Sequence, residues 1–191
     1  MLAQTLIFLV TTAGDLLVLA LLLRFILQLT RAPARNQLAL FLAAVTDFMV
    51  RPTRRLIPGW WGFDFATLVL AWVTAMLELA IVIAIKGYAL ESAGGLAVAV
   101  IAALALLNLI RLTIYIIIAA VILQAVLSWV QPYNALAPLL SSLTGPFLRP
   151  VRKRVPTIAN VDLSPLIVVV VGQLLLAVPL VWLESAVSRM L

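Results

Sequence analysis

The chain has 191 residues, of which 65% are hydrophobic and 10% charged, and its mean hydropathy is +1.23. Soluble domains are roughly half apolar and a quarter charged, so this composition argues against a soluble fold, whose surface needs more charge than this chain has. The net charge is +6, and the absence of cysteine and histidine excludes disulfides, imidazole bases and the usual zinc, haem or iron–sulfur ligands. We therefore expect a membrane protein without catalytic activity, cofactor or metal.

Four apolar segments are long enough to cross a hydrocarbon core of about 30 Å, which takes about 20 helical residues. They span residues 5–29, 65–85, 109–130 and 163–182. The run 96–107 precedes the third and is either a helical extension of it or an interfacial segment. Because no basic region precedes the first segment, we expect a retained span there rather than a cleaved signal. The sequence thus predicts an all-α membrane protein with about four transmembrane helices.

Two shorter apolar segments separate the spans of each pair. Residues 36–50 lie between the first and second spans, and residues 134–148 lie between the third and fourth. Each is about 15 residues long and so falls short of the usual spanning minimum of about 17. We expect both to form helices that are interfacial or re-entrant.

An internal repeat relates the two halves of the chain. Within residues 36–64, a shift of 98 positions, without a gap, brings ten residues onto identical residues of the second half. They are Asn36, Leu38, Ala39, Leu42, Thr46, Arg51, Pro52, Arg54, Pro58 and Asp64. We therefore divide the chain into a first repeat, 1–95, and a second, 96–191. Since each holds an even number of spans, we predict parallel repeats related by an axis along the membrane normal.

The basic residues concentrate in the connections between the spans of each pair. Nine of the thirteen lie there: Arg31, Arg35, Arg51, Arg54, Arg55, Arg149, Arg152, Lys153 and Arg154. Lysine and arginine favour cytoplasmic loops and attract anionic headgroups. We expect a multi-pass protein of the bacterial cytoplasmic (inner) membrane, with the basic loops cytoplasmic and the termini outside, rather than a protein that binds nucleic acid directly.

A basic proline motif occurs once in each half and supplies the candidate interface residues. The first copy is Arg51, Pro52, Arg54, Arg55, Pro58 and Asp64, and the second is Arg149, Pro150, Arg152, Lys153, Pro156 and Asp162. We expect the prolines to stop helices, because proline lacks an amide donor, and the aspartates to cap the spans that follow. Three interpretations stay open: a membrane-entry device, a docking surface for another protein, and a site for an anionic ligand or lipid headgroup.

Four further ionisable residues lie inside or at the edge of the predicted spans: Asp15, Arg24, Glu78 and Arg111. A charge at mid-depth costs at least about 2.5 kcal/mol, so such residues indicate pairing or function. We favour pairing between helices, or protonated carboxylates, over an ion pathway, because four scattered charges do not make a selectivity filter.

The two motifs resemble the YggT family, also called YlmG in Gram-positive bacteria and plastids. Its halves carry a threonine, prolines, paired basic residues and an acidic residue that opens the next span, as from Thr144 to Asp162 here. Gly14-Asp15 and Leu23-Arg24-Phe25 look like the first helix of that family. The resemblance implies a non-catalytic inner-membrane scaffold or assembly factor in cell division or envelope organisation. The alternative it implies is ion transport or osmotic-stress tolerance through potassium uptake.

The same resemblance implies the partners. We expect other membrane proteins and the lipid bilayer itself, with its anionic headgroups, to contact the chain, and a homo-oligomer stays open.

Overall fold

The computed structural model describes residues 1–33, 36–57, 59, 63–87, 94–131, 135–155 and 162–189. Its elements are α1 (Leu2–Leu29), α2 (Gln37–Leu56), α3 (Phe65–Ile85), α4 (Gly94–Val130), α5 (Ala137–Arg152), α6 (Ser164–Leu175), a π-helical segment η2 (Leu176–Leu180) and α7 (Val181–Ser188). All regular elements in these ranges are helices, which confirms the predicted all-α class. Pro58 and Pro156 lie outside the described residues.

Four helices are long and apolar enough to cross a membrane, as the sequence predicts, so this is a multi-pass membrane protein. They are Leu2–Leu29, Phe65–Ile85, Gly95–Val130 and Ser164–Ser188. Run 96–107 is a helical extension, because it belongs to the same continuous helix as 109–130. The fourth helix continues to Ser188, six residues past its predicted end, through the π-helical turn that contains Pro179.

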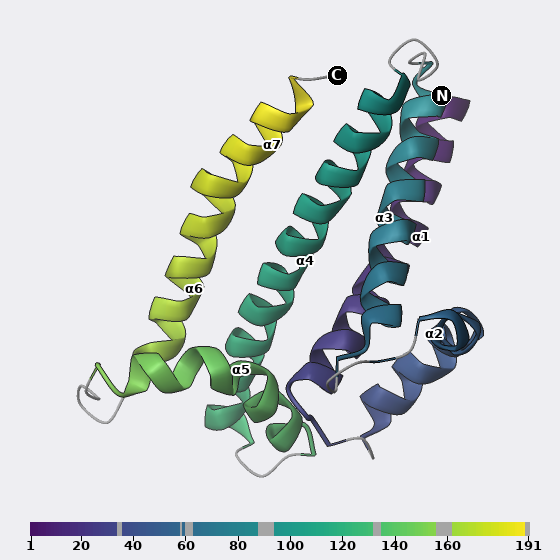
Figure 1. Ribbon diagram of the computed structural model, residues 1–191. Coiled ribbons are helices and arrows are strands. Elements are labelled where there is room, and N and C mark those ends of the chain that lie inside the picture. The colour runs from purple at the N-terminus through teal and green to yellow at the C-terminus, as the bar shows by residue number, and fades with distance from the viewer. Residues whose placement is uncertain are drawn as a thin grey trace.

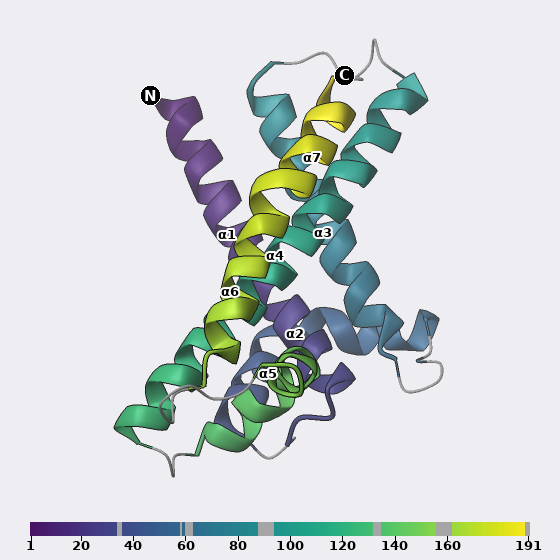
Figure 2. The same cartoon turned by 90° about the vertical axis from the view of Figure 1, so that its left-hand side faces the viewer.

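The long helices and the short helices have different directions in the molecule. The long ones, α1, α3, α4 and α6–α7, run between the two ends of the bundle, whereas α2 and α5 both lie across its lower end in Figures 1 and 2. Both termini lie at the opposite end (Figure 1). Helix α4 packs against α1 and α3 on one side and against α5, α6 and α7 on the other, so it joins the two halves of the structure.

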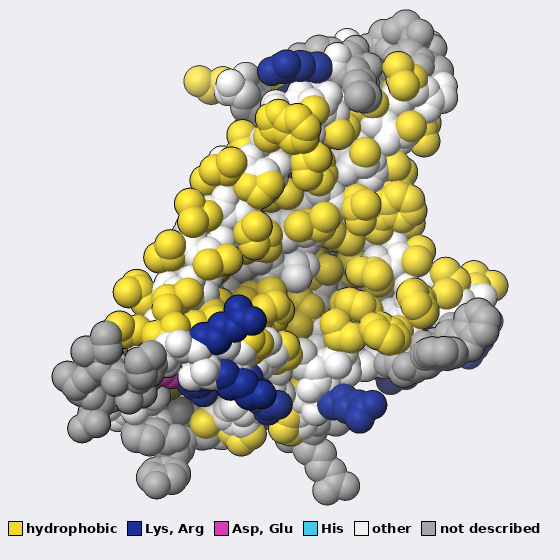
Figure 3. Space-filling model, turned by 60° about the vertical axis from the view of Figure 1, so that its left-hand side comes forward, with side chains coloured by type: hydrophobic (Ala, Val, Ile, Leu, Met, Phe, Trp, Pro, Cys, Tyr) yellow, Lys and Arg dark blue, Asp and Glu magenta, His cyan; other side chains and the backbone are white. Residues whose placement is uncertain are grey.

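The core lies where α1, α3 and α4 pack together. Val18 and Leu21 of α1 are fully buried, as are Ala71 of α3 and Ala105 of α4. Small residues let transmembrane helices approach closely, which explains the alanines at these contacts. Large apolar side chains cover the outer surface of the long helices, for example Phe8 at 65% exposure (Figure 3). Such a surface suits lipid, not water.

The prediction that the motif prolines stop helices is wrong at Pro52 and Pro150. Helix α2 continues through Pro52 to Leu56, and α5 continues through Pro150 to Arg152. Proline removes the hydrogen bond to the carbonyl four residues earlier, which is Phe48 for Pro52. Packing of α2 against α1 and α3 holds the helix, so it tolerates the loss of this one hydrogen bond.

Candidate functional site

The two crosswise helices carry most of the candidate residues on one end of the molecule. Each buries an apolar stripe that includes Leu42 and Val50 in α2 and Leu139 and Leu148 in α5. Their last turns carry arginines, which the partial negative charge at a helix C-terminus stabilises. We call α2 and α5, with Lys153 and Arg154 after α5, the basic platform; Figure 3 shows lysine and arginine side chains gathered at this end.

An ion pair ties α2 to the start of α3. Arg54 Nη2 donates to Asp64 Oδ2, and Arg54 Nε lies 3.4 Å from Asp64 Oδ1. Asp64 is only 3% exposed and also caps α3, because it accepts hydrogen bonds from the Thr67 amide at 3.3 Å and the Thr67 hydroxyl at 2.5 Å. Burial raises the pKa of Asp64, but the hydrogen bonds from Arg54 and Thr67 outweigh burial and hold that pKa below its usual value.

The second half contains the corresponding ion pair between α5 and the start of α6. Arg152 Nε lies 2.7 Å from Asp162 Oδ2, and Asp162 Oδ1 accepts a hydrogen bond of 2.9 Å from the Ser164 amide. Burial raises the pKa of Asp162 as well, and the bonds from Ser164 and Arg152 lower it by more. The side chain of Asp162 is 34% exposed, so this pair is far more open than that of Asp64. Asp64 is the N-cap of α3, as the sequence predicts, whereas Asp162 lies one residue before Leu163, the N-cap of α6, and binds the Ser164 amide from there.

Arg24, predicted as an intramembrane charge, ties α1 to α2. Its Nη1 lies 2.8 Å from Asp47 Oδ1 and donates to Thr46 Oγ1 at 2.6 Å, and the Arg24 side chain is 14% exposed. Asp47 also pairs with Arg51 at 2.7 Å. The hydrogen bond from Arg24 is the main reason that the pKa of Asp47 is lowered. The sequence analysis missed Asp47, although its position four residues before Arg51 is the spacing of a helical ion pair.

The other three predicted intramembrane charges, Arg111, Asp15 and Glu78, lie on the long helices. Arg111 of α4 pairs with Glu184 of α7, a residue that the sequence analysis did not single out. Asp15 is exposed on α1. Glu78 is buried and packs so closely against Gly14 of α1 that the Cβ of any other residue at position 14 would lie 2.7 Å from the Glu78 Cδ. The Oε2 atom of Glu78 has no hydrogen-bond partner among the described residues. The predicted pairing is thus realised at Arg24 and Arg111 with partners that were not foreseen.

The outer cations of the platform are free of ion pairs with the described residues. Arg55 lies in the last turn of α2, and Arg149, Lys153 and Arg154 lie in or after the last turn of α5; all four are exposed. Aspartates therefore neutralise the platform arginines that face the bundle, while the other basic side chains stay exposed. Such an arrangement can bind an acidic surface or an anionic headgroup.

The two aspartates provide a matched test of burial. We expect Asp64→Ala to lower the free energy of unfolding by about 2 kcal/mol, because it removes the N-cap of α3 and the buried acceptor of Arg54 and Thr67. Asp162→Ala should cost about 1 kcal/mol or less, because its pair is more exposed. Thermal unfolding in detergent measures both; equal losses would contradict the burial argument.

The contribution of Asp64 to the free energy of unfolding should depend on pH. Since folding lowers the pKa of Asp64 below the usual value of 3.8, the stabilisation is present above that pH and is lost as the pH falls through the folded pKa. The difference between the wild type and Asp64→Ala should therefore shrink below about pH 4.

Comparison with known proteins identifies the family. The CCB3/YggT family model matches residues 3–85 and 103–183. The chain is 37% identical over 165 residues to the uncharacterized protein PA0392 of Pseudomonas aeruginosa, covering 84% of this chain and 80% of that protein. It is 28% identical over 167 residues to the uncharacterized protein YggT of Escherichia coli K12, covering 87% and 84%. No solved structure matches. The chain belongs to the CCB3/YggT family.

Proposed function

We propose that the chain is a non-catalytic scaffold or assembly factor of the bacterial cytoplasmic membrane, acting in cell division or envelope organisation through its basic platform. The observation that carries this proposal is the division of the cations into two sets. Arg24, Arg54 and Arg152 are held by aspartates, whereas Arg55 and Lys153 are exposed without ion pairs to the described residues. Helices that are fixed by ion pairs and that expose unpaired cations are suited to docking an acidic partner.

We further propose that the platform helices are interfacial and that the two halves are parallel repeats of one unit. Their crosswise orientation at one end of the bundle supports the first point (Figure 1). The second is supported by the family match to two segments and by ion pairs at Arg54–Asp64 and Arg152–Asp162, which are 98 positions apart in the sequence.

The platform should face the cytoplasm, since most lysine and arginine residues of the chain lie at this end. The chain has no cysteine, so a single introduced cysteine reports its own side of the membrane. In intact cells, we expect a membrane-impermeant maleimide to label Lys86→Cys, which is at the opposite end of the bundle, and to spare Lys153→Cys until the membrane is opened. The reverse pattern would contradict the proposed orientation.

Docking by the platform is tested with charge reversal. We expect Arg55→Glu combined with Lys153→Glu to reduce the recovery of crosslinked partners from native membranes by about fivefold, because losing about 1 kcal/mol of exposed charge attraction has that effect. Lys86→Glu, a reversal at the other end, is the control and should leave recovery unchanged. Unchanged recovery for the double variant, at equal protein level, would sink the docking proposal.

A second candidate function is ion transport in osmotic tolerance or potassium uptake. The observation that favours it is Glu78, whose buried Oε2 lacks a hydrogen-bond partner among the described residues. A buried carboxyl within a membrane helix is costly and often marks a proton or cation site.

Neutral replacements separate the two functions. For a scaffold, we expect Glu78→Gln and Asp15→Asn to keep partner recovery, since an amide preserves shape and most hydrogen-bonding capacity. In liposomes, the wild type should show no potassium or proton flux above that of empty vesicles. Flux by the wild type that Glu78→Gln abolishes, while exposed Asp15→Asn does not, would establish transport instead.

A further inference from the structure

A cavity of about 560 Å³ opens between the end of α1 and the start of α2, and its polar lining is dominated by cations. Arg24, Arg31 and Arg54 line it together with Gln28. Apolar side chains from both helices form the rest of the wall: Leu27, Ala32, Pro33, Ala39, Leu40, Leu42 and Ala43. The cavity therefore combines arginine donors with an apolar wall.

The arginines keep donor capacity for a ligand. Arg24 uses only Nη1 in its bonds to Thr46 and Asp47, so its other nitrogens have no acceptor among the described residues. Arg31 has no ion pair with a described residue and is held at a left-handed φ of 52° directly after α1. Two carboxylates, Asp47 and Asp64, balance Arg24 and Arg54 and leave Arg31 uncompensated.

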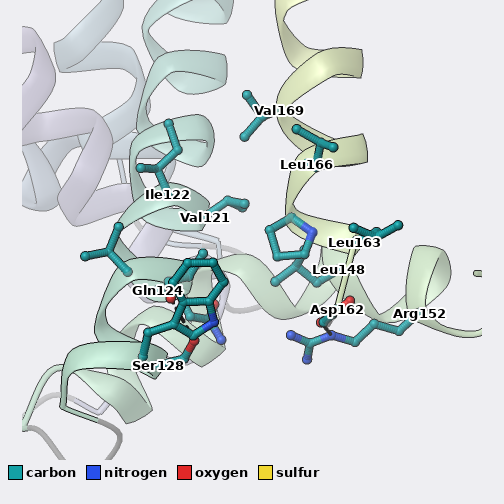
Figure 4. Close-up of a pocket in the computed structure, with 14 residues that line it drawn as sticks. Val121, Ile122, Gln124, Ser128, Leu148, Arg152, Asp162, Leu163, Leu166 and Val169 are labelled. Carbon is teal, nitrogen blue, oxygen red and sulfur yellow. Dashed lines mark hydrogen bonds and ion pairs between the residues drawn. The ribbon is translucent and has the colours of Figure 1, made fainter. Parts of the chain in front are cut away.

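The second half divides the corresponding lining between two cavities with different chemistry. The same shift of 98 positions takes Arg24, Gln28 and Arg31 to Ile122, Val126 and Trp129, which line a cavity of about 450 Å³ between α4 and α6. Figure 4 shows its apolar wall, with the pair of Arg152 and Asp162 at one edge. The equivalents of the α2 wall line a separate cavity of about 380 Å³ between α4 and α5. Arg54 corresponds to Arg152, whereas Arg24 and Arg31 have apolar or aromatic counterparts. The cations of the first cavity are not required by the fold.

The position of the first cavity limits what can enter it. Arg24 lies five residues before the end of α1, about 8 Å at 1.5 Å per residue, so the cavity sits at the end of a candidate span. Beside it, Leu40 and Phe41 on α2 are more than 60% exposed. A ligand here meets cations and lipid-like surface together. The guanidinium group of arginine forms strong, often bidentate hydrogen bonds with phosphate oxygens, as it does with carboxylates.

We propose that this cavity is a binding site for an anionic phospholipid. The phosphate accepts hydrogen bonds from Arg31 and from the free donors of Arg24, and the acyl chains leave along the exposed apolar face of α2. The site goes beyond the proposed scaffold function, because it needs no protein partner.

The test compares Arg31→Asn with Lys86→Gln in the purified full-length protein. Asparagine tolerates the left-handed conformation of Arg31, so the variant removes the charge and keeps the backbone. Lys86 is an exposed cation after the end of α3 that does not line the cavity and does not belong to the platform. With dihexanoyl phosphatidylglycerol as the probe and native mass spectrometry as the readout, we expect Arg31→Asn to weaken binding about tenfold, the loss of one charged hydrogen bond. Lys86→Gln should bind like the wild type. Equal weakening in both variants, or none in Arg31→Asn, would overturn the site.

Two further probes fix the ligand class. Dihexanoyl phosphatidylcholine tests whether the negative charge matters, and inorganic phosphate tests whether the chains matter. The proposal requires that phosphatidylglycerol bind more tightly than phosphatidylcholine and that phosphate, at the same concentration, fail to displace it. Either failure overturns the phospholipid assignment.

If Arg31→Asn does not fold, Ala43→Leu gives an independent test, because it narrows the cavity without changing any charge. We expect this variant to lose phosphatidylglycerol binding as well. Wild-type binding by a folded Ala43→Leu would overturn the proposal.

Discussion

The ion pair between the last turn of a short helix and the aspartate that opens the next span is the constraint on which the architecture depends. A buried carboxylate is costly unless it is paired and hydrogen-bonded, and Asp64 meets that demand through Arg54 and Thr67. Because only ten positions separate Arg54 from Asp64, the pair closes the turn between α2 and α3. A short helix closed in this way lies across the bundle end instead of continuing into the span.

This ion pair is buried to different extents in the two halves. Asp64 is 3% exposed, whereas Asp162 is 34% exposed. The first half adds a charged contact from Arg24 to Asp47, while in the second Thr144 bonds the neutral Gln124 of α4. Electrostatic ties therefore fix α2 more firmly than α5. Common architecture with different local chemistry lets one half carry the cationic cavity and the other an apolar one.

The parts of the fold that local rules govern could be predicted from the sequence. Hydropathy finds the spans, and the capping aspartates follow from their positions before them. Local rules failed to predict the features that depend on how the helices pack against one another. Pro52 stays in its helix because packing of α2 against α1 and α3 holds the helix despite the lost hydrogen bond. Asp47 and Glu184 were missed, since their partners, Arg24 and Arg111, lie 23 and 73 positions away and only helix packing brings them together.

The length of α4 indicates how deep the platform lies in the membrane, and that depth limits what can bind to it. Its 37 residues extend about 55 Å, well beyond a hydrocarbon core of about 30 Å, so the helix must tilt or project. Trp129, 80% exposed near its end, suits the headgroup layer. The platform then lies at headgroup depth, where an acidic partner and anionic lipids compete for the same cations. Because Arg31 lines the cavity while Arg55 does not, a lipid can occupy the cavity and leave Arg55 free for a protein.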